Sequence, residues 1–448
     1  MHVEELADIL AFDFEVESTP RFRAERRSND PVHTVLSTCS SLLTVVHGMG
    51  FRVVQFAHFS VKEYLTSKRL SKAKDNISRF HVSTTSAHSI IAQACLGILL
   101  HLDDNITRDG LKDFSLAEYA AKHCVDHARI GNASPKVQDG MRRLFDPRKH
   151  HLSVWVWIYD PEEPWRRSRR PVEARATPLH YATVYNMHDI ATFLIVEHSQ
   201  DVNARGFDEE ETPLHVSTRL GHVESARVLL KHGADTDARD DVDASPLERA
   251  AHEGRMELAR VLLELGTNAN SHDFLRWTPL HWASEVGQLA VAQVLLSHGA
   301  DVTSRCKKNE TPLHRASSKE VAQLLLRHGA DANALDIKNR TPLHRVSGLG
   351  RVGAALALLE HGVDANARDS NNATPLHLAS ISVYPGWRGQ VVRLLLRHGS
   401  DIHARDREGR TPFTRARAAG IQEIVKLLLK HRAEDHGVMT TEGQEYVA

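Results

Sequence analysis

Several features that mark secreted or membrane proteins are scarce in this 448-residue sequence. It has only four cysteines, Cys39, Cys95, Cys124 and Cys306, and no two of them form a C-x-x-C pair. Isolated cysteines indicate a reducing compartment, in which thiols are buried as small apolar groups. There is no basic-then-apolar leader and no apolar run of about 18 residues. We therefore expect a cytoplasmic protein without a membrane partner, with a nuclear location as the alternative.

Net charge is also small. The chain has 56 lysines and arginines against 57 aspartates and glutamates, a formal net charge of -1. This balance gives no reason to expect nucleic acid as a partner. Composition is that of a soluble protein, with 41% hydrophobic and 25% charged residues. At this length, two or three domains are expected.

Motifs of known catalytic sites are missing from the sequence. It contains no G-x-x-x-x-G-K-[ST] phosphate loop, no H-E-x-x-H, no G-x-S-x-G and no protein-kinase set. These motifs place nucleotide phosphates, a zinc ion, a nucleophilic serine or a transferred phosphoryl group. We therefore expect no enzymatic activity and no cofactor.

A tetrapeptide, Thr-Pro-Leu-His, recurs through most of the chain. Complete copies start at Thr177, Thr212, Thr278, Thr311, Thr341 and Thr374, and degenerate copies start at Ser245 and Thr411. The steps between successive starts are 35, 33, 33, 33, 30, 33 and 37 residues. A period near 33 residues predicts a stack of small similar units, which serves as a binding surface.

Each unit is predicted to contain two short helices and a turn, as the copy at Thr278 illustrates. Thr278 can cap the first helix through its hydroxyl, and Pro279 suits the first helical position because its missing N–H is not needed there. Gly287 separates the helices. Residues 291–296 place valines and leucines at helical spacing, and Gly299 ends the second helix.

These motifs (TPLH-x-A, G-H, LL and HGAD-x-N) resemble ankyrin repeats over residues 172–436. The resemblance implies helix pairs stacked in a shallow arc, with hairpin loops at one edge, and a role in protein–protein recognition. The 30-residue step deletes the turn after His314, and the 37-residue step inserts residues 382–389. In the last unit Arg432 replaces the capping glycine and Thr414 replaces the histidine, as suits the end of a solenoid.

The resemblance implies that a partner protein binds at the hairpin tips and the concave face of the first helices. An apolar tip flanked by charge is a plausible hot spot, because exposed aromatic side chains cost solubility unless they are covered. Alternatively, the aromatic residues pack on the adjacent hairpin. The candidate partner-binding residues are Phe274, Leu275, Trp277, Lys307, Lys308, Lys338, Arg340, Tyr384 and Trp387.

The sequence holds 30 histidines, which could suggest a metal site. Six belong to the Thr-Pro-Leu-His motifs and five precede a capping glycine. Neighbouring copies stand one repeat apart and so do not converge on one ion. We expect no metal, and the resemblance implies that the motif histidines form hydrogen bonds locally and across units.

Residues before the repeats follow a different pattern. Residues 3–10 have helical spacing, residues 42–46 and 51–56 are β-like, and Ser60 with Glu63 forms a capping box that opens a helix. Such an order fits a small winged-helix fold. Further helices are expected over residues 86–160, including an apolar segment, residues 155–159, that docks this region onto the first repeat.

This region resembles the winged-helix domain and helical segment of fungal NACHT–ankyrin proteins of the STAND type, through the phrase Gln55-Phe-Ala-His-Phe-Ser-Val-Lys-Glu-Tyr-Leu65. In that family a histidine at the position of His58 contacts the phosphate of bound ADP. Because this sequence lacks a phosphate loop, His58 can have that role only with a further upstream domain; otherwise it steadies a helix start.

The predicted architecture is mainly α: a solenoid of about eight ankyrin units preceded by a small winged-helix-like α+β domain and a helical segment. The expected boundaries are a winged-helix-like domain over 1–85, helices over 86–160, a linker over 161–171, repeats over 172–436 and a flexible tail over 437–448. The expected function is a protein-interaction sensor or scaffold of a NACHT-type signalling protein. The alternatives are the C-terminal part of a STAND NTPase and a free-standing ankyrin adaptor.

Overall fold

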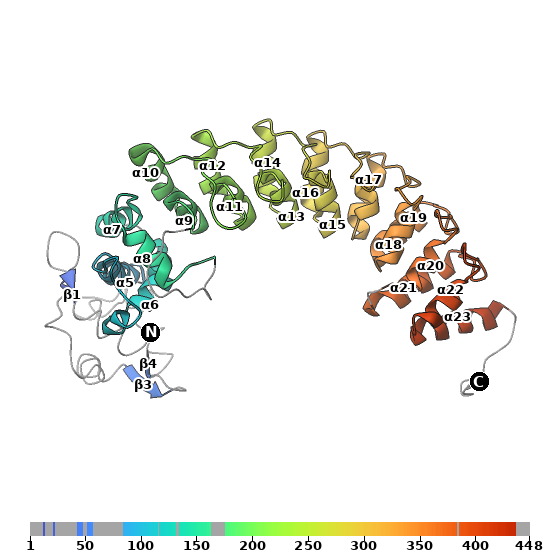
Figure 1. Cartoon of the computed structure of the whole chain (residues 1–448), viewed down its shortest axis with the longest axis horizontal. Coiled ribbons are helices and arrows are strands. Elements are labelled where there is room, and N and C mark those ends of the chain that lie inside the picture. Colours follow the sequence, from blue (N-terminus) through green and yellow to red (C-terminus); the bar gives the residue numbers. More distant parts are fainter. Residues whose placement is uncertain are drawn as a thin grey trace, which may run out of the picture. The chain divides into compact units, whose positions relative to one another are not determined.

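The computed structural model describes residues 84–114, 116–130, 134–162, 175–382 and 385–435, and four short strand segments nearer the N-terminus (Figure 1). The chain divides into two compact units, residues 1–208 and residues 209–448. Each unit is described below by itself. The division at residues 208 and 209 falls within the predicted repeats, so the first repeat belongs to the first unit.

Two antiparallel strand pairs lie in the first unit. Strand β1 (Phe12–Asp13) pairs with β2 (Arg21–Phe22), and β3 (Leu43–His47) pairs with β4 (Arg52–Phe56). Strands β3 and β4 coincide with the two β-like runs in the sequence. The predicted helices around them, the Ser60–Glu63 capping box and His58 lie outside the described residues, so the winged helix remains a prediction.

Four helices and a short 3-10 turn form the helical region of this unit. They are α5 (Thr84–Leu99), η3 (Gly110–Asp113), α6 (Ala117–Ile130), α7 (Pro135–Phe145) and α8 (His151–Ile158). Ser134 caps α7 by accepting a hydrogen bond from the Val137 amide at 3.3 Å. The predicted apolar stripe on α5 is buried at Cys95, Ile98 and Leu99, whereas Ile90 is 47% exposed.

An aromatic cluster joins this helical region to the first repeat, α9 (Pro178–Val184) and α10 (His188–His198). The Trp155 ring is fully buried, and its indole N–H donates to the Ala121 carbonyl at 2.7 Å. Its ring centroid lies 5.6 Å from that of Phe145 and 5.4 Å from that of Tyr185. The predicted docking of residues 155–159 onto the first repeat is therefore confirmed.

The second unit is a row of helix pairs that follow one another in chain order (Figure 1). In each pair an inner helix opened by the tetrapeptide precedes an outer helix. The elements are α11 (Pro213–Leu220), α12 (Val223–Lys231), α13 (Pro246–Glu253), α14 (Met256–Glu264), α15 (Pro279–Val286), α16 (Leu289–Ser297), η4 (Pro312–Arg315), α17 (Lys319–Arg327), α18 (Pro342–Gly348), α19 (Val352–Glu360), α20 (Pro375–Ala379), α21 (Pro385–Arg397), α22 (Pro412–Ala418) and α23 (Gln422–Asp435). With α9 and α10, the described residues hold the eight predicted units.

The tetrapeptide opens every inner element in the same way. Its threonine or serine is the N-cap, its proline occupies the first helical position, and its fourth residue completes a capping box. The leucine points into the stack; Leu214, Leu247 and Leu280, for example, have no exposed surface. One short sequence thus starts a helix and supplies a core residue.

The irregular steps change individual elements. In the unit that spans the 30-residue step, the inner helix is reduced to the single 3-10 turn η4, because the residues that would continue it are absent. In the 37-residue step, part of the predicted insertion extends the outer helix α21, which begins at Pro385. In the last unit, α23 continues past Arg432 to Asp435, since no glycine stops it there.

Candidate interaction surface

Hairpin turns precede the inner helices and are fixed by a recurring aspartate. Asp273 Oδ1 accepts hydrogen bonds from the amides of Leu275 and Trp277, both at 2.8 Å. Asp336 binds the Lys338 and Arg340 amides in the same way, at 2.7 and 2.9 Å. The same role recurs at Asp240, Asp369 and Asp406. The hairpin tips are therefore rigid.

Successive tips are joined by main-chain hydrogen bonds. The Lys307 amide donates to the Leu275 carbonyl at 2.9 Å, and the Ile337 amide donates to the Lys308 carbonyl at 3.1 Å. The Ser370 amide continues the series to Lys338 at 2.9 Å. The side chains of neighbouring tips are consequently held in one row, which we call the tip row.

The motif histidines connect each unit with the next. His281 Nδ1 accepts from the Thr278 amide at 3.2 Å, and its Nε2 donates to the Glu310 carbonyl, 3.1 Å away in the following unit. Nδ1 must be unprotonated to accept, so the ring is the neutral Nε2–H tautomer. Equivalent inter-unit bonds are made by His215, His314, His344 and His377. The hydrogen bonds implied by the family resemblance are confirmed.

Burial lowers the pKa of these histidines. The pKa of His281 is lowered to about 4, mainly because burial disfavours the charged ring. The pKa values of His314, His344 and His377 are lowered for the same first reason. These rings are therefore neutral at physiological pH and act as structural hydrogen-bonding groups.

Phe274 and Leu275 lie at the tip as predicted. Phe274 is 51% exposed and Leu275 is partly exposed. The Lys307 ammonium of the next tip lies 5.8 Å from the centre of the Phe274 ring. An exposed aromatic ring next to a cation is the arrangement expected of the candidate hot spot.

Trp277 departs from the prediction of an exposed tip aromatic. It is only 8% exposed, and its ring centroid lies 4.6 Å from that of Trp282. The Arg315 guanidinium covers it at 4.3 Å from the ring centre. Trp277 directly precedes Thr278, the N-cap of α15, and its ring packs against these neighbours and is not presented at the tip.

The predicted basic residues divide into two groups. Lys307, Lys308 and Lys338 are exposed on the tip row. Arg340, in contrast, is held by Asp336, with 2.6 Å between Nη2 and Oδ2, and its side chain is 17% exposed. Arg340 therefore belongs to the hairpin structure, and the prediction of it as a contact residue is not supported by its position.

The second aromatic candidate lies at the start of α21. Trp387 is 57% exposed there. Tyr384 lies outside the described residues, so its part in the candidate site stays a prediction.

The shortened unit carries a network of charges that the sequence reading did not find. Arg351 donates to the Arg315 carbonyl at 2.6 Å and reaches Glu285, two units back, with 2.5 Å between Nη2 and Oε1. Arg315 in turn pairs with Glu310, which is fully buried. Because η4 is short, Arg351 can cross to Glu285 and close the space left by the missing helical turn.

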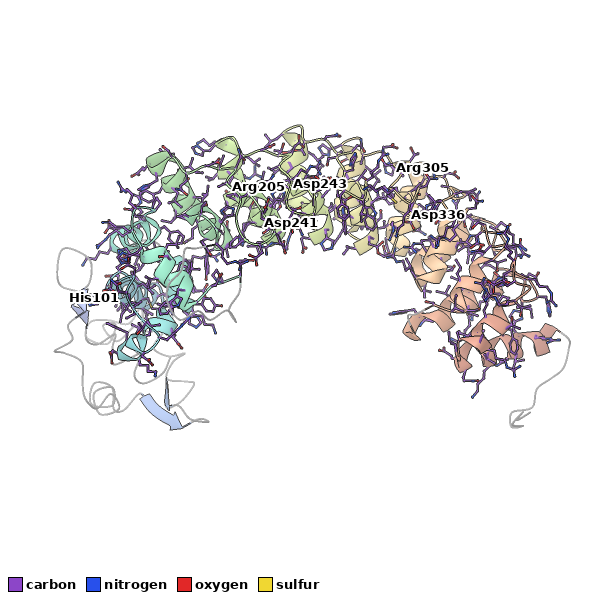
Figure 2. The ribbon with its side chains drawn as sticks, viewed as in Figure 1. His101, Arg205, Asp241, Asp243, Arg305 and Asp336 are labelled. Atoms are coloured by element: carbon purple, nitrogen blue, oxygen red, sulfur yellow. The ribbon has the colours of Figure 1, made fainter. Side chains whose placement is uncertain are left out.

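Charge changes sign along the tip row. Asp241 and Asp243 are exposed on one hairpin, whereas Lys307, Lys308 and Lys338 are exposed on later ones. Figure 2 labels Asp241 and Asp243, with Arg305 and Asp336 farther along the same unit. Of these, Asp336 is buried, at 2% exposure.

Two contributors to the tips were missed from the sequence. An aspartate stands five residues before five of the eight motif threonines or serines, and its period could have revealed it; these are Asp240, Asp273, Asp336, Asp369 and Asp406. Ile337, which is 63% exposed beside Lys338, stands four residues before its motif threonine, as Phe274 does, so the same spacing could have identified it.

No group of three or more histidine, cysteine, aspartate or glutamate side chains is arranged to hold a metal ion among the residues described. Within the same ranges, every helix is too short or too polar for a membrane crossing. Cys95, Cys124 and Cys306 are free thiols and buried.

Comparison with known proteins identifies the repeat. A family model described as "Ankyrin repeats (3 copies)" matches residues 166–240, 239–306, 313–386 and 364–439, more than half of the chain. The helix pairs, capped turns and tip row thus define a repeat solenoid of the class that mediates protein–protein interaction. The chain belongs to the ankyrin-repeat family.

Individual relatives cover parts of the chain. An "Azaphilone pigments biosynthesis cluster protein L" of Monascus ruber is 29% identical over 253 residues, 52% of this chain and 52% of that protein. "Ankyrin repeat domain-containing protein 13B" of Homo sapiens is 45% identical over 64 residues, 13% of this chain and 9% of its own length. The chain thus spans about half the length of the first relative and less of the second.

Solved ankyrin structures are similar to parts of the chain. The human ASB11 ankyrin repeat domain covers 49% of it at 25% identity, with a TM-score of 0.44 and 98% of that domain matched. The ankyrin repeat domain of Bcl-3 covers 50% at 26% identity, with a TM-score of 0.39 and all of that domain matched.

Proposed function

We propose that this chain is the sensor or scaffold part of a NACHT-type signalling protein and binds another protein through the tip row and the adjacent inner-helix face. The observation that carries this proposal is the pairing of exposed Phe274 and Ile337 with exposed lysines on rigid, hydrogen-bonded tips. Rigid apolar anchors ringed by charge bind with little loss of conformational entropy. No chemical step is assigned to the chain.

Support for the NACHT-type assignment comes from the region before the repeats. The antiparallel β3–β4 pair overlaps the two β-like runs on which the winged-helix prediction rests, and α5 to α8 overlap the predicted helical segment. The relative from Monascus ruber is fungal, as the resemblance implies. We retain the division into residues 1–85, 86–160, 161–171, 172–436 and 437–448, and a cytoplasmic or nuclear location.

The interaction is tested by purifying the full-length chain, with its bound proteins, from cells of the source organism. In a variant with Phe274→Ser and Ile337→Ser, we expect specific partners to be lost, because both anchors are removed. The matched control is Leu265→Ser with Leu429→Ser, which changes two other exposed apolar residues, 61% and 47% exposed, at the end of the outer helix α14 and on the outer helix α23. Equal recovery of partners by both variants would contradict the proposal.

A second test addresses the origin of the first region. We expect that the purified chain does not bind ATP in calorimetry, because it contains no phosphate loop. The alternative is that the chain is the C-terminal part of a STAND NTPase. In that case the transcript upstream of the Met1 codon would encode an in-frame G-x-x-x-x-G-K-[ST] motif. A free-standing adaptor would have no such segment.

A further inference from the structure

The three tips at residues 273–277, 306–310 and 336–340 have an unusual distribution of charge. Their acidic side chains, Asp273, Glu310 and Asp336, are all at most 2% exposed. Their exposed charges are basic: Arg276, Lys307, Lys308 and Lys338. Every carboxylate at these tips is buried and bonded within the protein, so only positive charges face outward.

The buried carboxylates have identified partners within the protein. Asp273 and Asp336 accept the hairpin amides, and Glu310 pairs with Arg315 and lies 3.0 Å from Arg345 Nε. The tip lysines, by contrast, form no ion pair with any residue that the structure describes. A partly exposed lysine elsewhere, Lys319, is paired with Glu360 at 2.8 Å. The tip lysines are therefore available to a ligand.

Apolar side chains lie among these cations. Phe274 is 51% exposed and in reach of Lys307, and Ile337 is 63% exposed beside Lys338. The main-chain bonds from Lys307 to Leu275 and from Ile337 to Lys308 fix the spacing between them. A ligand that matches this surface must therefore combine negative charge with apolar side chains.

Acidic residues on the preceding tip make the exposed charge differ between the two ends of this surface. Asp241 and Asp243 are exposed on the hairpin before Phe274, and the Asp241 amide is bonded to the Glu209 carbonyl at 3.0 Å. A uniform polyanion such as nucleic acid is repelled at that end by these carboxylates. An acidic protein segment with apolar side chains satisfies both features.

We propose that residues 274–338 of the tip row bind an acidic segment of a partner protein, with apolar side chains of that segment seated against Phe274 and Ile337. This inference rests on the proposed protein-binding function and specifies the chemistry of the partner. Lys307, Lys308 and Lys338 select the negative charge, and Asp241 and Asp243 exclude segments that extend their negative charge beyond Phe274.

The test uses the full-length chain and a short fluorescein-labelled peptide of glutamates interrupted by leucines. Two matched peptides replace every glutamate by lysine or by glutamine. We expect fluorescence anisotropy to show tightest binding of the glutamate peptide, weakened by salt because the Debye length shrinks. The combined variant Lys307→Glu, Lys308→Glu and Lys338→Glu is expected to weaken binding about tenfold or more.

The control variant has the same change in net charge on the outer helices: Lys231→Glu, Arg327→Glu and Arg397→Glu, all at exposed positions. It should bind the glutamate peptide as the unmodified chain does. The proposal is overturned if the lysine peptide binds as tightly, if both triple variants weaken binding equally, or if a single-stranded oligonucleotide displaces the peptide at lower concentration. If partners still depend on Phe274 and Ile337 in cells, such a result rejects the acidic segment and leaves the protein-binding function standing.

Discussion

The motif histidine shows how one residue type can hold a repeat protein together. His281 accepts from Thr278 with one ring nitrogen and donates to the Glu310 carbonyl with the other. In the degenerate unit Glu248 completes the capping box, and its other carboxylate oxygen accepts from Ser271. A glutamate or threonine can therefore cap the helix, but only histidine links this position to the carbonyl of the next unit.

Replacing His281 by glutamine tests this distinction. Glutamine can complete the capping box but cannot reach the Glu310 carbonyl in the same way, which leaves that buried acceptor unpaired. We expect a loss of about 1–3 kcal/mol in the free energy of unfolding, measured by urea denaturation of the full chain. The control, His328→Gln, changes an exposed histidine before a capping glycine and should stay within about 0.5 kcal/mol of the unmodified chain.

The lowered histidine pKa values predict acid sensitivity. The pKa of His281 is about 4 in the folded chain, against 6.5 for a free side chain. At pH values above the pKa of the unfolded chain, the ring is neutral in both the folded and the unfolded state, and the full stability is present. Between the two values only the unfolded state binds the proton, so stability falls as pH falls and levels off below the folded value.

Unfolding free energies at about pH 7 and about pH 5 should therefore differ, with His281 alone contributing on the order of 2 kcal/mol to the loss. His127 and His151 in the first unit also have pKa values lowered to about 4, mainly by burial, and add in the same direction. Urea denaturation across this pH range measures the effect. Stability that stays constant or rises on acidification would show that these rings are protonated in the folded chain.

The exposure of side chains at the tips was only partly predictable. The exposure of Phe274 followed from its place in the repeat, because the hairpin position is set by the period. Trp277 and Arg340 lie three positions after Phe274 and Ile337, directly before the motif threonine, and both side chains belong to the supporting structure of their hairpins. Sequence spacing identifies a hairpin but does not distinguish its outward from its inward side chains.

At the scale of elements, the shortened unit shows how the stack tolerates a deletion. In a regular unit Arg255 donates to the Arg219 carbonyl of the preceding inner helix at 3.0 and 3.1 Å. Arg351 makes the corresponding bond to the Arg315 carbonyl and also reaches Glu285. The extra ion pair is possible because η4 lacks the helical residues that would separate Arg351 from Glu285.

The substitution Arg351→Ala is expected to destabilise the chain by about 2–4 kcal/mol, because it removes a buried carbonyl's donor and leaves Glu285 with one partner fewer. Arg255→Ala removes only the common bond and should cost about 0.5–2 kcal/mol. Urea denaturation of the two variants gives the comparison. A loss for Arg351→Ala no larger than that for Arg255→Ala would refute the bridging role.

Trp155 joins the helical region to the first repeat, and its removal should affect the first unit strongly. Trp155→Ala opens a cavity among Phe145, Tyr181 and Tyr185, with an expected cost of about 3–5 kcal/mol. Thermal unfolding and limited proteolysis of the full chain measure this loss. Trp387→Ala, at a residue that is 57% exposed, serves as the control and should leave the melting temperature nearly unchanged.

Element boundaries were largely accessible from the sequence, since the motif threonine, its proline and the capping glycines mark where helices begin and end. The period also identified both irregular units. The period did not predict the structures of these irregular units: η4 is a single turn, and residues from 385 onward extend α21. Those outcomes depend on packing between units and on the pairing of Arg351 with Glu285, which the repeat spacing does not show.

At the scale of the whole chain, repetition explains why so much of the fold was predictable. Each unit contacts mainly its neighbours, so a local motif that fits one pair fits them all. The charge pattern of the tip row is less predictable, because it depends on which carboxylates are buried and bonded inside the hairpins. That property depends on burial of Asp273, Glu310 and Asp336, which the sequence shows only as acidic residues.

The most direct test of the account is site-specific photo-cross-linking in the full-length chain. A photoreactive amino acid is placed at Phe274, Lys307 or Ile337 on the tip row, and at Lys231 or Arg327 on outer helices, all exposed positions. After irradiation in cells of the source organism, we expect discrete cross-linked proteins from the tip positions and none in common from the outer helices. Adducts formed equally from both sets, or only from the outer helices, would contradict it.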